Sequence, residues 1–301
     1  MSKSFALAFA LVAACASGRA AAQRRPDTSL VVTTDWLARH LDDPSVVVLA
    51  VEHDRDSYSR GHIPGARYVD YSSLIARVNG ISTELPAADS LARLLGALGV
   101  TPASHVVVYA DMLPMSARAV VTLEYAGVRH VSLLDGGAVR WASEHRSMTD
   151  AAPKFAAARF TPAPNREMIA SADWVRGKLS KPGVSLIDTR TDAEYNGGGE
   201  RHGGTSTGHL PGARQLEWEQ LTAPGNDLQL KDLAELRHLY AERVAPGDTV
   251  VTYCAVGYRA SVTYLVARYL GYPVKLYDGS YDEWSKLGYP TETTRTSLLR
   301  Q

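Results

Sequence analysis

An internal repeat is the feature of this sequence that most constrains its fold. Three groups of residues recur in the same order and at similar spacing: 61–67 (GHIPGAR) as 208–214 (GHLPGAR), 106–109 as 250–253, and 134–137 with Trp141 as 277–280 with Trp284. Self-similarity over about half the chain indicates a duplicated domain, because short-repeat solenoids have much shorter periods. A length of 301 residues also suggests about two domains.

The connection between the two copies is marked by prolines. Three prolines fall within residues 149–165, a stretch with little hydrophobic periodicity. Proline removes backbone donors and favours extended segments. We therefore expect a first domain over residues 28–148, a linker over 149–165 and a second domain over 166–294.

Each half is expected to alternate strands and helices. The expected strands are 46–51, 106–109 and 131–134 in the first half and 184–187, 249–253 and 274–277 in the second. The expected helices are 89–98, 117–125, 232–243 and 260–270. Short apolar strands separated by helices predict an α/β fold, with a parallel sheet covered on both faces.

The N-terminus has the pattern of an export signal. Lys3 precedes a nearly continuous apolar run over 5–16, and three alanines follow at 20–22. A run of this length is typical of a signal peptide and too short to span a bilayer. We expect residues 1–22 to be a signal peptide and the protein to be exported, either periplasmic or secreted. The alternative is a lipoprotein at the cell envelope with a lipid anchor on Cys15, because the residues before it resemble a weak lipobox.

Net charge and the length of apolar runs give no sign of a nucleic-acid partner or of a membrane span in the mature protein, although a local basic patch stays possible. The chain carries 32 basic and 32 acidic residues, so bulk electrostatics predicts neither a nucleic-acid partner nor attraction to a charged membrane surface. No stretch after the N-terminal run reaches 18 consecutive apolar residues. We therefore expect no membrane span in the mature protein.

The cysteine count points to one free thiol. The chain has two cysteines, and removal of the signal peptide leaves only Cys254. Such a residue is either a small buried hydrophobe or a reactive thiol. Cys254 follows directly on the strand over 249–253 and precedes a short loop and a helix. Parallel α/β sheets bind ligands at this place, outside the carboxyl ends of their strands.

The residues around Cys254 favour the reactive thiol. Backbone N–H groups at the start of the following helix stabilise an anion, such as a thiolate. Gly257 suits a loop position with unusual backbone angles. Arg259 adds a positive charge for an anionic ligand.

The loop at 254–261, CAVGYRAS, resembles the active-site loop of rhodanese-like sulfurtransferases. The two GH(I/L)PGA strings, LIDTR at 186–190 and DGS through Trp284 resemble further signatures of that family. The resemblance covers nearly all of residues 28–294. It implies two tandem rhodanese-like domains, each a five-stranded parallel sheet flanked by helices, with an inactive first domain and a catalytic second one.

The resemblance also implies a reaction and its residues. Cys254 would attack the outer sulfur of thiosulfate, release sulfite and hold a persulfide, from which a thiophilic acceptor such as cyanide or a thiol takes the sulfur. The implied substrate-binding residues are Ala255, Val256, Gly257, Tyr258 and Arg259. Asp188 and Arg190 would form either a supporting ion pair near this loop or a purely structural pair. No metal and no organic cofactor is expected, and the partners are a small-molecule sulfur donor and acceptor.

The first half lacks the nucleophile. Alignment of the repeat places Ala110 opposite Cys254, and residues 50–52 (AVE) opposite 188–190 (DTR). The first-half loop over 110–118 is expected to be the longer of the two. These differences favour an inactive duplicate over a second active site.

Two positions depart from the thiosulfate branch of the family. Vertebrate thiosulfate sulfurtransferases carry basic residues near the position of Glu194 and at that of Val256. The mercaptopyruvate branch carries Cys-Gly-Ser-Gly-Val-Thr in this loop, which the chain lacks. Thiosulfate is therefore the favoured donor. The alternatives are 3-mercaptopyruvate as donor, or a persulfide carrier that delivers sulfur to a protein partner.

A cysteine-dependent phosphatase or arsenate reductase is the rival enzyme class. Those enzymes typically have five residues between cysteine and arginine, whereas four separate Cys254 from Arg259. The smaller loop suits a persulfide sulfur better than a phosphate group, so this class is disfavoured.

The remaining repeated residues are interpreted as structural. His62 and His209 belong to the duplicated string, and the half without a nucleophile keeps its copy. We therefore expect each histidine to fix a turn and not to catalyse or bind a metal. Trp141 and Trp284 are expected in the core. Residues 196–208, rich in glycine, are expected to form a loop insertion that shapes access to the site.

Overall fold

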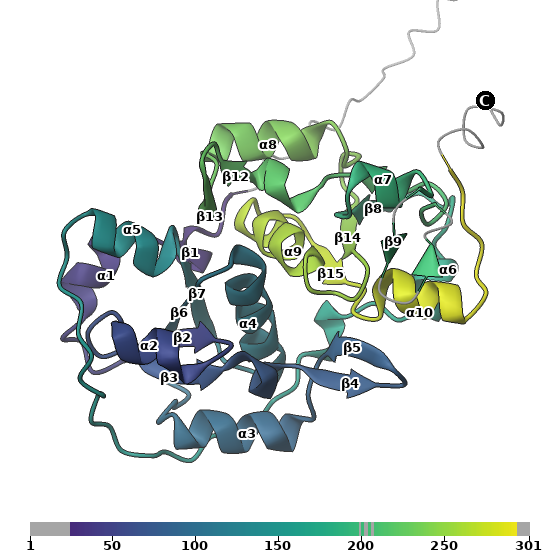
Figure 1. The fold of residues 1–301 in the computed structure, drawn as a ribbon. Coiled ribbons are helices and arrows are strands. Elements are labelled where there is room, and N and C mark those ends of the chain that lie inside the picture. The colour runs from purple at the N-terminus through teal and green to yellow at the C-terminus, as the bar shows by residue number, and fades with distance from the viewer. Residues whose placement is uncertain (1–24, 199, 202–203, 206–207, 294–301) are drawn as a thin grey trace, which may run out of the picture.

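Each half of the chain folds around one parallel sheet with helices packed against it (Figure 1). The computed structural model describes residues 25–198, 200–201, 204–205 and 208–293. The expected signal peptide over 1–22, with Cys15, lies outside these residues. Among the described residues, no helix is long and apolar enough to cross a membrane.

The first half confirms the expected five-stranded parallel sheet, with strand order β1-β7-β6-β2-β3. Its elements are β1 (Val31–Val32), α1 (Thr34–His40), β2 (Val46–Glu52), α2 (Arg55–Arg60), β3 (Arg67–Asp70), β4 (Ala76–Val78), β5 (Ile81–Glu84), α3 (Ala88–Ala97), β6 (His105–Ala110), α4 (Leu113–Ala126), β7 (His130–Leu134) and α5 (Gly137–Ser143). Its three central strands are buried along almost their whole length, which explains their continuous apolar sequence.

The second half has a four-stranded sheet, with strand order β11-β8-β14-β15. Its elements are α6 (Ala172–Arg176), β8 (Val184–Asp188), α7 (Asp192–Tyr195), β9 (Glu200–Arg201), β10 (Gly204–Thr205), β11 (Arg214–Gln215), β12 (Thr222–Ala223), β13 (Asn226–Leu230), α8 (Leu233–Ala241), β14 (Thr249–Tyr253), α9 (Ala260–Tyr269), β15 (Val274–Leu276) and α10 (Ser280–Lys286). The place of a fifth strand is taken by Ile169, which forms a single parallel bridge to Leu276. The expectation of five full strands is therefore corrected here, because this edge segment pairs at only one residue.

Helix α4 begins earlier than the sequence pattern predicts. The expected start was residue 117, but the helix begins at Leu113, with Pro114 in its first turn. Proline suits the first turn of a helix, where its missing N–H leaves no bond unmade. Only two residues therefore separate β6 from α4, and the expectation that the first half has the longer loop is wrong. Arg118, expected at the end of that loop, is a fully buried helical residue.

The two repeated histidines are buried and held in the same way. His62 Nδ1 is hydrogen-bonded to Tyr58 O at 3.0 Å, and its ring stacks on Tyr58 with 3.8 Å between centroids. His209 Nδ1 is bonded to Tyr195 O at 2.9 Å, with a stacking distance of 3.7 Å. Each ring ties the start of the repeated string to the preceding helix, α2 or α7, which agrees with the structural role expected from the repeat.

The two repeated tryptophans lie in the cores of their halves, as expected. Trp141 and Trp284 are both buried. The indole Nε1 of Trp141 donates to Ser147 O, and that of Trp284 donates to Pro290 O. A buried indole N–H needs such a partner. Each tryptophan therefore also holds the segment that follows the last helix of its half in place.

The glycine-rich insertion is not a plain loop. Strands β9 and β10 pair antiparallel, with Arg201 opposite Gly204 and Glu200 opposite Thr205. This pairing satisfies backbone groups that an irregular loop would leave to water.

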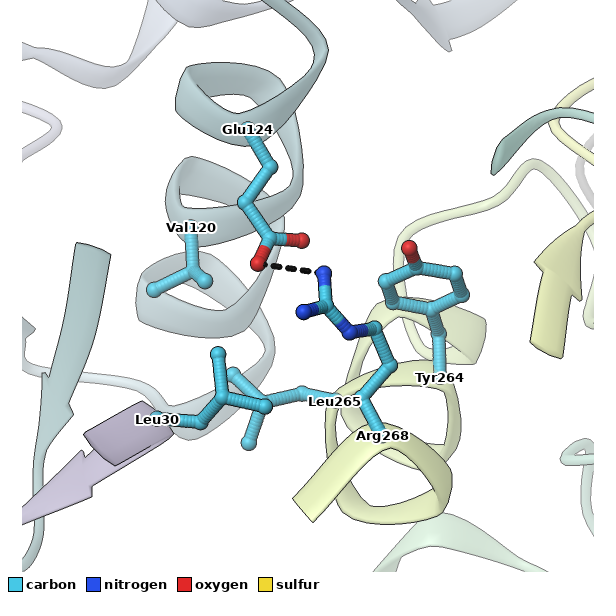
Figure 2. Close-up of a pocket in the computed structure, with 6 residues that line it drawn as sticks. All are labelled: Leu30, Val120, Glu124, Tyr264, Leu265 and Arg268. Carbon is cyan, nitrogen blue, oxygen red and sulfur yellow. Dashed lines mark hydrogen bonds and ion pairs between the residues drawn. The ribbon is translucent and has the colours of Figure 1, made fainter. Parts of the chain in front are cut away.

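The two halves meet along α4 and α9, which lie side by side at the centre of the molecule (Figure 1). Figure 2 shows Glu124 of α4 and Arg268 of α9 pointing toward one another, with 2.6 Å between Glu124 Oε1 and Arg268 Nη1. Val120 and Leu265, both buried, lie beside this ion pair. The interface therefore combines apolar packing with an ion pair between the halves.

Each half also reaches across with its small antiparallel hairpin. Leu85, directly after the β4–β5 hairpin, donates its N–H to Asp278 Oδ2 of the second half at 3.0 Å. Leu230 at the end of β13 donates to Asp135 Oδ1 of the first half at 2.9 Å. This reciprocal exchange fixes the carboxyl end of the second sheet against first-half residues.

Candidate active site

Cys254 lies where the sequence predicts it, directly after the carboxyl end of β14. Strand β14 is flanked by β8 and β15, with Tyr253 opposite Asp188 and Thr252 opposite Leu276. The residue is fully buried and forms no disulfide. The thiol is thus held at the binding end of a parallel sheet, in an apolar environment.

Ser280 fixes the backbone of Cys254, a contact that sequence reasoning missed. The N–H of Cys254 donates to Ser280 Oγ at 3.2 Å, and Ser280 Oγ donates to Tyr277 O at 2.8 Å. Ser280 adopts φ +53°, a left-handed conformation in which glycine is favoured. The first half has Gly137 at this repeat position, with φ +55°. The left-handed backbone of Ser280 is less stable than the same backbone at a glycine would be. Its hydrogen bond to Cys254 N gives this serine a structural role that glycine could not fill.

The loop after Cys254 is tied down on both sides. Tyr281 N donates to Cys254 O at 3.0 Å, and Asp282 N donates to Ala255 O at 3.0 Å. Gly257 has φ +83°, and a Cβ there would lie 2.7 Å from Asp278 O, so this position requires glycine. Val256 is half-buried, and its carbonyl accepts a hydrogen bond from Thr83 Oγ1 of the first half.

The guanidinium of Arg259 forms an ion pair with a carboxylate of the same half. Its Nη1 and Nη2 contact Glu194 Oε2 and Oε1 at 2.8 and 2.7 Å, a bidentate ion pair. Burial alone would raise the pKa of Glu194, but the hydrogen bonds and charge of Arg259 outweigh it and lower this pKa to about 2. Burial likewise opposes the charge on Arg259, yet the bonds to Glu194 and the nearby Cys254 raise its pKa. The carboxylate at 194 therefore neutralises the arginine.

The local sequence around Glu194 contained a signal for this arrangement. Thr191 Oγ1 accepts from Glu194 N at 3.3 Å, and Glu194 Oε2 accepts from Thr191 N at 3.1 Å. This is a capping box, whose Thr-x-x-Glu pattern begins α7, with Thr191 as the N-cap and Glu194 in the first turn. The pattern predicts the orientation of Glu194, although not its partner.

Asp188 and Arg190 form a buried ion pair close to the loop. Arg190 Nη2 lies 2.6 Å from Asp188 Oδ2, and Arg190 Nη2 also donates to Gly208 O at 2.9 Å. The guanidinium lies 4.0 Å from the centroid of the Tyr281 ring. Asp188 is next to Tyr253 across the sheet. The pair thus joins β8, the repeated histidine string and the start of α10 beneath the Cys254 loop.

Two first-half residues that the sequence analysis missed face the same loop. Arg118 Nη1 lies 2.5 Å from Asp278 Oδ1, and Arg118 Nη2 donates to Thr83 O. Tyr71, on the 3-10 helix Tyr71–Leu74, is buried and packs edge-on against the Tyr258 ring, with 5.8 Å between centroids. No sequence motif marks these residues, because their partners lie in the other half.

The corresponding end of the first sheet has different chemistry. Ala110 ends β6 in register with Val51, so no thiol stands there. Glu52 is buried at the repeat position of Arg190. Burial first, and then the nearby Asp111 and Asp54 carboxylates, raise the pKa of Glu52 to about 7. The first half thus presents a carboxyl group where the second half presents a cation.

The described part of the chain contains no group of three or more His, Cys, Asp or Glu side chains that could hold a metal ion. The arrangement around Cys254 therefore offers a buried thiol, a fixed loop and two arginine ion pairs, Arg118–Asp278 and Arg259–Glu194. A thiol in such a loop can act as a nucleophile toward a sulfur atom.

Comparison with known proteins places this geometry in a family. The rhodanese-like domain family matches the chain twice, over residues 33–144 and 171–287. The chain is 33% identical over 272 residues to the sulfur carrier protein TtuD of Thermus thermophilus, covering 86% of this chain and 94% of that protein. It is 32% identical over 277 residues to thiosulfate sulfurtransferase of Corynebacterium glutamicum, covering 87% and 90%.

A solved structure agrees with these matches. The chain superposes on the 3-mercaptopyruvate sulfurtransferase SseA of Escherichia coli with a TM-score of 0.73 and 29% identity, covering 83% of this chain and 98% of that one. Two matched domains, a shared fold and the relatives agree with the motifs around Cys254. The chain therefore belongs to the rhodanese-like sulfurtransferase family, as a tandem pair of rhodanese-like domains.

Proposed function

We propose that the chain transfers sulfane sulfur from thiosulfate to cyanide or a thiol through a persulfide on Cys254. The observation that carries the proposal is the placement of this thiol at the carboxyl end of β14, in a loop fixed by both halves. The similarity to a thiosulfate sulfurtransferase over most of both chains supports thiosulfate as the donor.

The proposed reaction has two displacement steps. The Cys254 thiolate attacks the outer sulfur of thiosulfate, the S–S bond of thiosulfate breaks, and sulfite leaves with the electron pair. Cyanide then attacks the outer sulfur of the persulfide, thiocyanate leaves, and the Cys254 thiolate is regenerated. Sulfur and electrons balance over the cycle, so no external oxidant or reductant is required.

The remaining predicted site residues have proposed roles in the same site. The backbone from Ala255 to Tyr258 would enclose the transferred sulfur, and Arg259 would hold the loop to α7 through Glu194. Asp188 and Arg190 would support the loop from below. The bidentate and buried contacts of both arginines support positioning roles for them.

The first test is thiocyanate formation from thiosulfate and cyanide by the purified protein. Double displacement predicts parallel lines in double-reciprocal plots when one substrate is varied at several fixed levels of the other. Cys254→Ser should form no thiocyanate. Ser143→Ala is its matched control and should keep the parental rate, because Ser143 is exposed and its hydroxyl, within the described residues, donates to Arg140 O. A folded protein that gives no thiocyanate would overturn thiosulfate as the donor.

Two other donor and acceptor choices follow from the relatives. One relative is named a 3-mercaptopyruvate sulfurtransferase and another a sulfur carrier. A preference for 3-mercaptopyruvate would appear as a higher kcat/KM with that donor than with thiosulfate. A carrier would load Cys254 once, stall with small acceptors and resume turnover only with a protein acceptor.

We also propose that the protein is exported and acts in the periplasm or outside the cell. The apolar run over residues 5–16 and the alanines at 20–22 support this proposal. N-terminal sequencing of protein from fractionated cells tests it. A mature chain that begins near residue 23 is expected, and an unprocessed chain in the cytoplasm would contradict the proposal. A lipid-modified N-terminus at Cys15 would favour the lipoprotein alternative.

A further inference from the structure

The residue expected to bind an anionic donor is already engaged. Arg259 forms a bidentate pair with Glu194. Glu217 and Glu219 also lie close enough for the charge of Arg259 to influence their ionisation. A dianion such as thiosulfate would therefore meet a neutralised arginine with further carboxylates beside it. Other hydrogen-bond donors must contribute to binding it.

Two buried hydrogen-bonding groups near the Cys254 loop, each able to donate, have no hydrogen-bond partner among the described residues. Within the described residues, Tyr71 Oη and Arg118 Nε form no hydrogen bond. Both residues belong to the first half, and both side chains are almost completely buried. A buried polar group without a partner is costly and needs an explanation, such as a bound ligand. Here, two such donors occur in one region.

The surroundings place the Tyr71 hydroxyl at the catalytic loop. Its ring contacts Tyr258, four residues after Cys254. The groups that act electrostatically on the hydroxyl are Arg118, Tyr258, Cys254 and Asp278, after the larger effect of burial. Arg118 is fixed in turn, because Asp278 and Thr83 O hold its two Nη atoms. Tyr71 therefore packs against the catalytic loop through Tyr258, in the electrostatic range of Cys254 and of the fixed Arg118 cation.

We infer that Tyr71 binds the sulfur substrate. Its hydroxyl donates a hydrogen bond to a sulfonate oxygen of thiosulfate bound at Cys254. This inference rests on the proposed function. When the S–S bond of thiosulfate breaks, negative charge accumulates on the sulfite that leaves. A preorganised O–H donor at that oxygen stabilises the charge without a proton transfer. The half without a nucleophile thereby supplies part of the active site.

The matching residue of the second half differs in both burial and chemistry. Trp218 begins the 3-10 helix Trp218–Leu221, which corresponds to Tyr71–Leu74 in the first half. Trp218 is only partly buried, and its side chain carries an N–H where Tyr71 carries a hydroxyl. A buried hydroxyl at this position is therefore particular to the element that faces Cys254.

Tyr71→Phe removes only the hydroxyl and tests the inference. Sulfite release in a single turnover with thiosulfate should slow about tenfold, the effect of losing one hydrogen bond of ordinary net strength. The rate at which cyanide removes sulfur from the loaded enzyme should not change. The thermal unfolding midpoint should stay the same or rise, because the hydroxyl has no hydrogen-bond partner among the described residues.

Tyr109→Phe is the matched control. Tyr109 is equally buried, but its hydroxyl accepts a hydrogen bond from Ile63 N at 3.3 Å. Its loss should lower the unfolding midpoint and leave sulfite release unchanged. If Tyr71→Phe releases sulfite at the parental rate, unfolds at a lower temperature or slows the cyanide step, the inference is overturned. If the parent protein itself releases no sulfite, the proposed function fails first.

Discussion

Arg118 on α4 of the first half forms a buried ion pair with Asp278 of the second half, with 2.5 Å between Nη1 and Oδ1. Asp278 also accepts the N–H of Leu85 from the hairpin that crosses the interface. The corresponding first-half residue, Asp135, accepts the N–H of Leu230 in the same manner. The halves therefore hold each other reciprocally, but the fully buried arginine is present only on the side of the nucleophile.

Loss of Arg118 is expected to destabilise the protein strongly. Arg118→Met leaves the Asp278 carboxylate buried without its cation, which typically costs about 3–5 kcal/mol. Arg140→Met is the control, because Arg140 pairs with Asp135 while 29% exposed and should cost less than about 1 kcal/mol. Urea unfolding of both variants checks the prediction. Equal losses would show that burial of the Arg118–Asp278 pair contributes nothing specific.

Removal of the Ser280 hydroxyl is expected to damage both stability and turnover. Ser280→Ala leaves the buried N–H of Cys254 without its acceptor, at a cost of about 1–3 kcal/mol. Thiocyanate formation should fall because the cysteine backbone is no longer fixed. Thermal unfolding and steady-state rates measure the two effects. A variant as stable and as active as the parent would show that the hydrogen bond from Cys254 N to Ser280 Oγ contributes to neither stability nor turnover.

The Glu194–Arg259 pair predicts a specific acid dependence of stability. The pKa of Glu194 is lowered from 4.5 to about 2 in the folded protein, because the bonds to Arg259 outweigh burial. A carboxyl group with a lowered pKa stabilises the fold above its unfolded pKa, and this stabilisation is lost as the pH falls toward the folded value. The pair should therefore weaken between about pH 4.5 and pH 2.

Glu194→Gln isolates this contribution. The difference in unfolding free energy between parent and variant should be largest above pH 5 and should shrink toward pH 2. Chemical unfolding at a series of pH values measures it. A difference that stays constant over this range would mean that Glu194 does not titrate against Arg259.

The repeat and the strand pattern predicted most of the fold. The strand Thr249–Tyr253 has the expected bounds, because a short run of β-branched and aromatic residues that follows a Pro-Gly-Asp turn favours a strand. The start of α4 at Leu113 does not follow from hydrophobic periodicity, because Pro114 fits a loop as well as the first turn of a helix. The fifth strand of the second sheet was overpredicted, because one bridge at Ile169 carries no sequence pattern.

The candidate site was only partly predictable. Cys254, Gly257 and Arg259 lie in one short string whose spacing indicates an anion-binding loop. The partners of that loop are distant in sequence: Glu194 lies 65 residues from Arg259, and Arg118 lies 160 residues from Asp278. Local periodicity holds no information on such pairs. They follow only from the packing of the two halves.

The most direct test of the central claim is mass spectrometry of the protein after incubation with thiosulfate. The account predicts one additional sulfur atom on the peptide that contains Cys254, and its removal by cyanide with formation of thiocyanate. Cys254→Ser should gain no sulfur. An unmodified Cys254 in the folded parent, or sulfur carried equally by the serine variant, would contradict the assignment of Cys254 as the sulfur-transferring nucleophile.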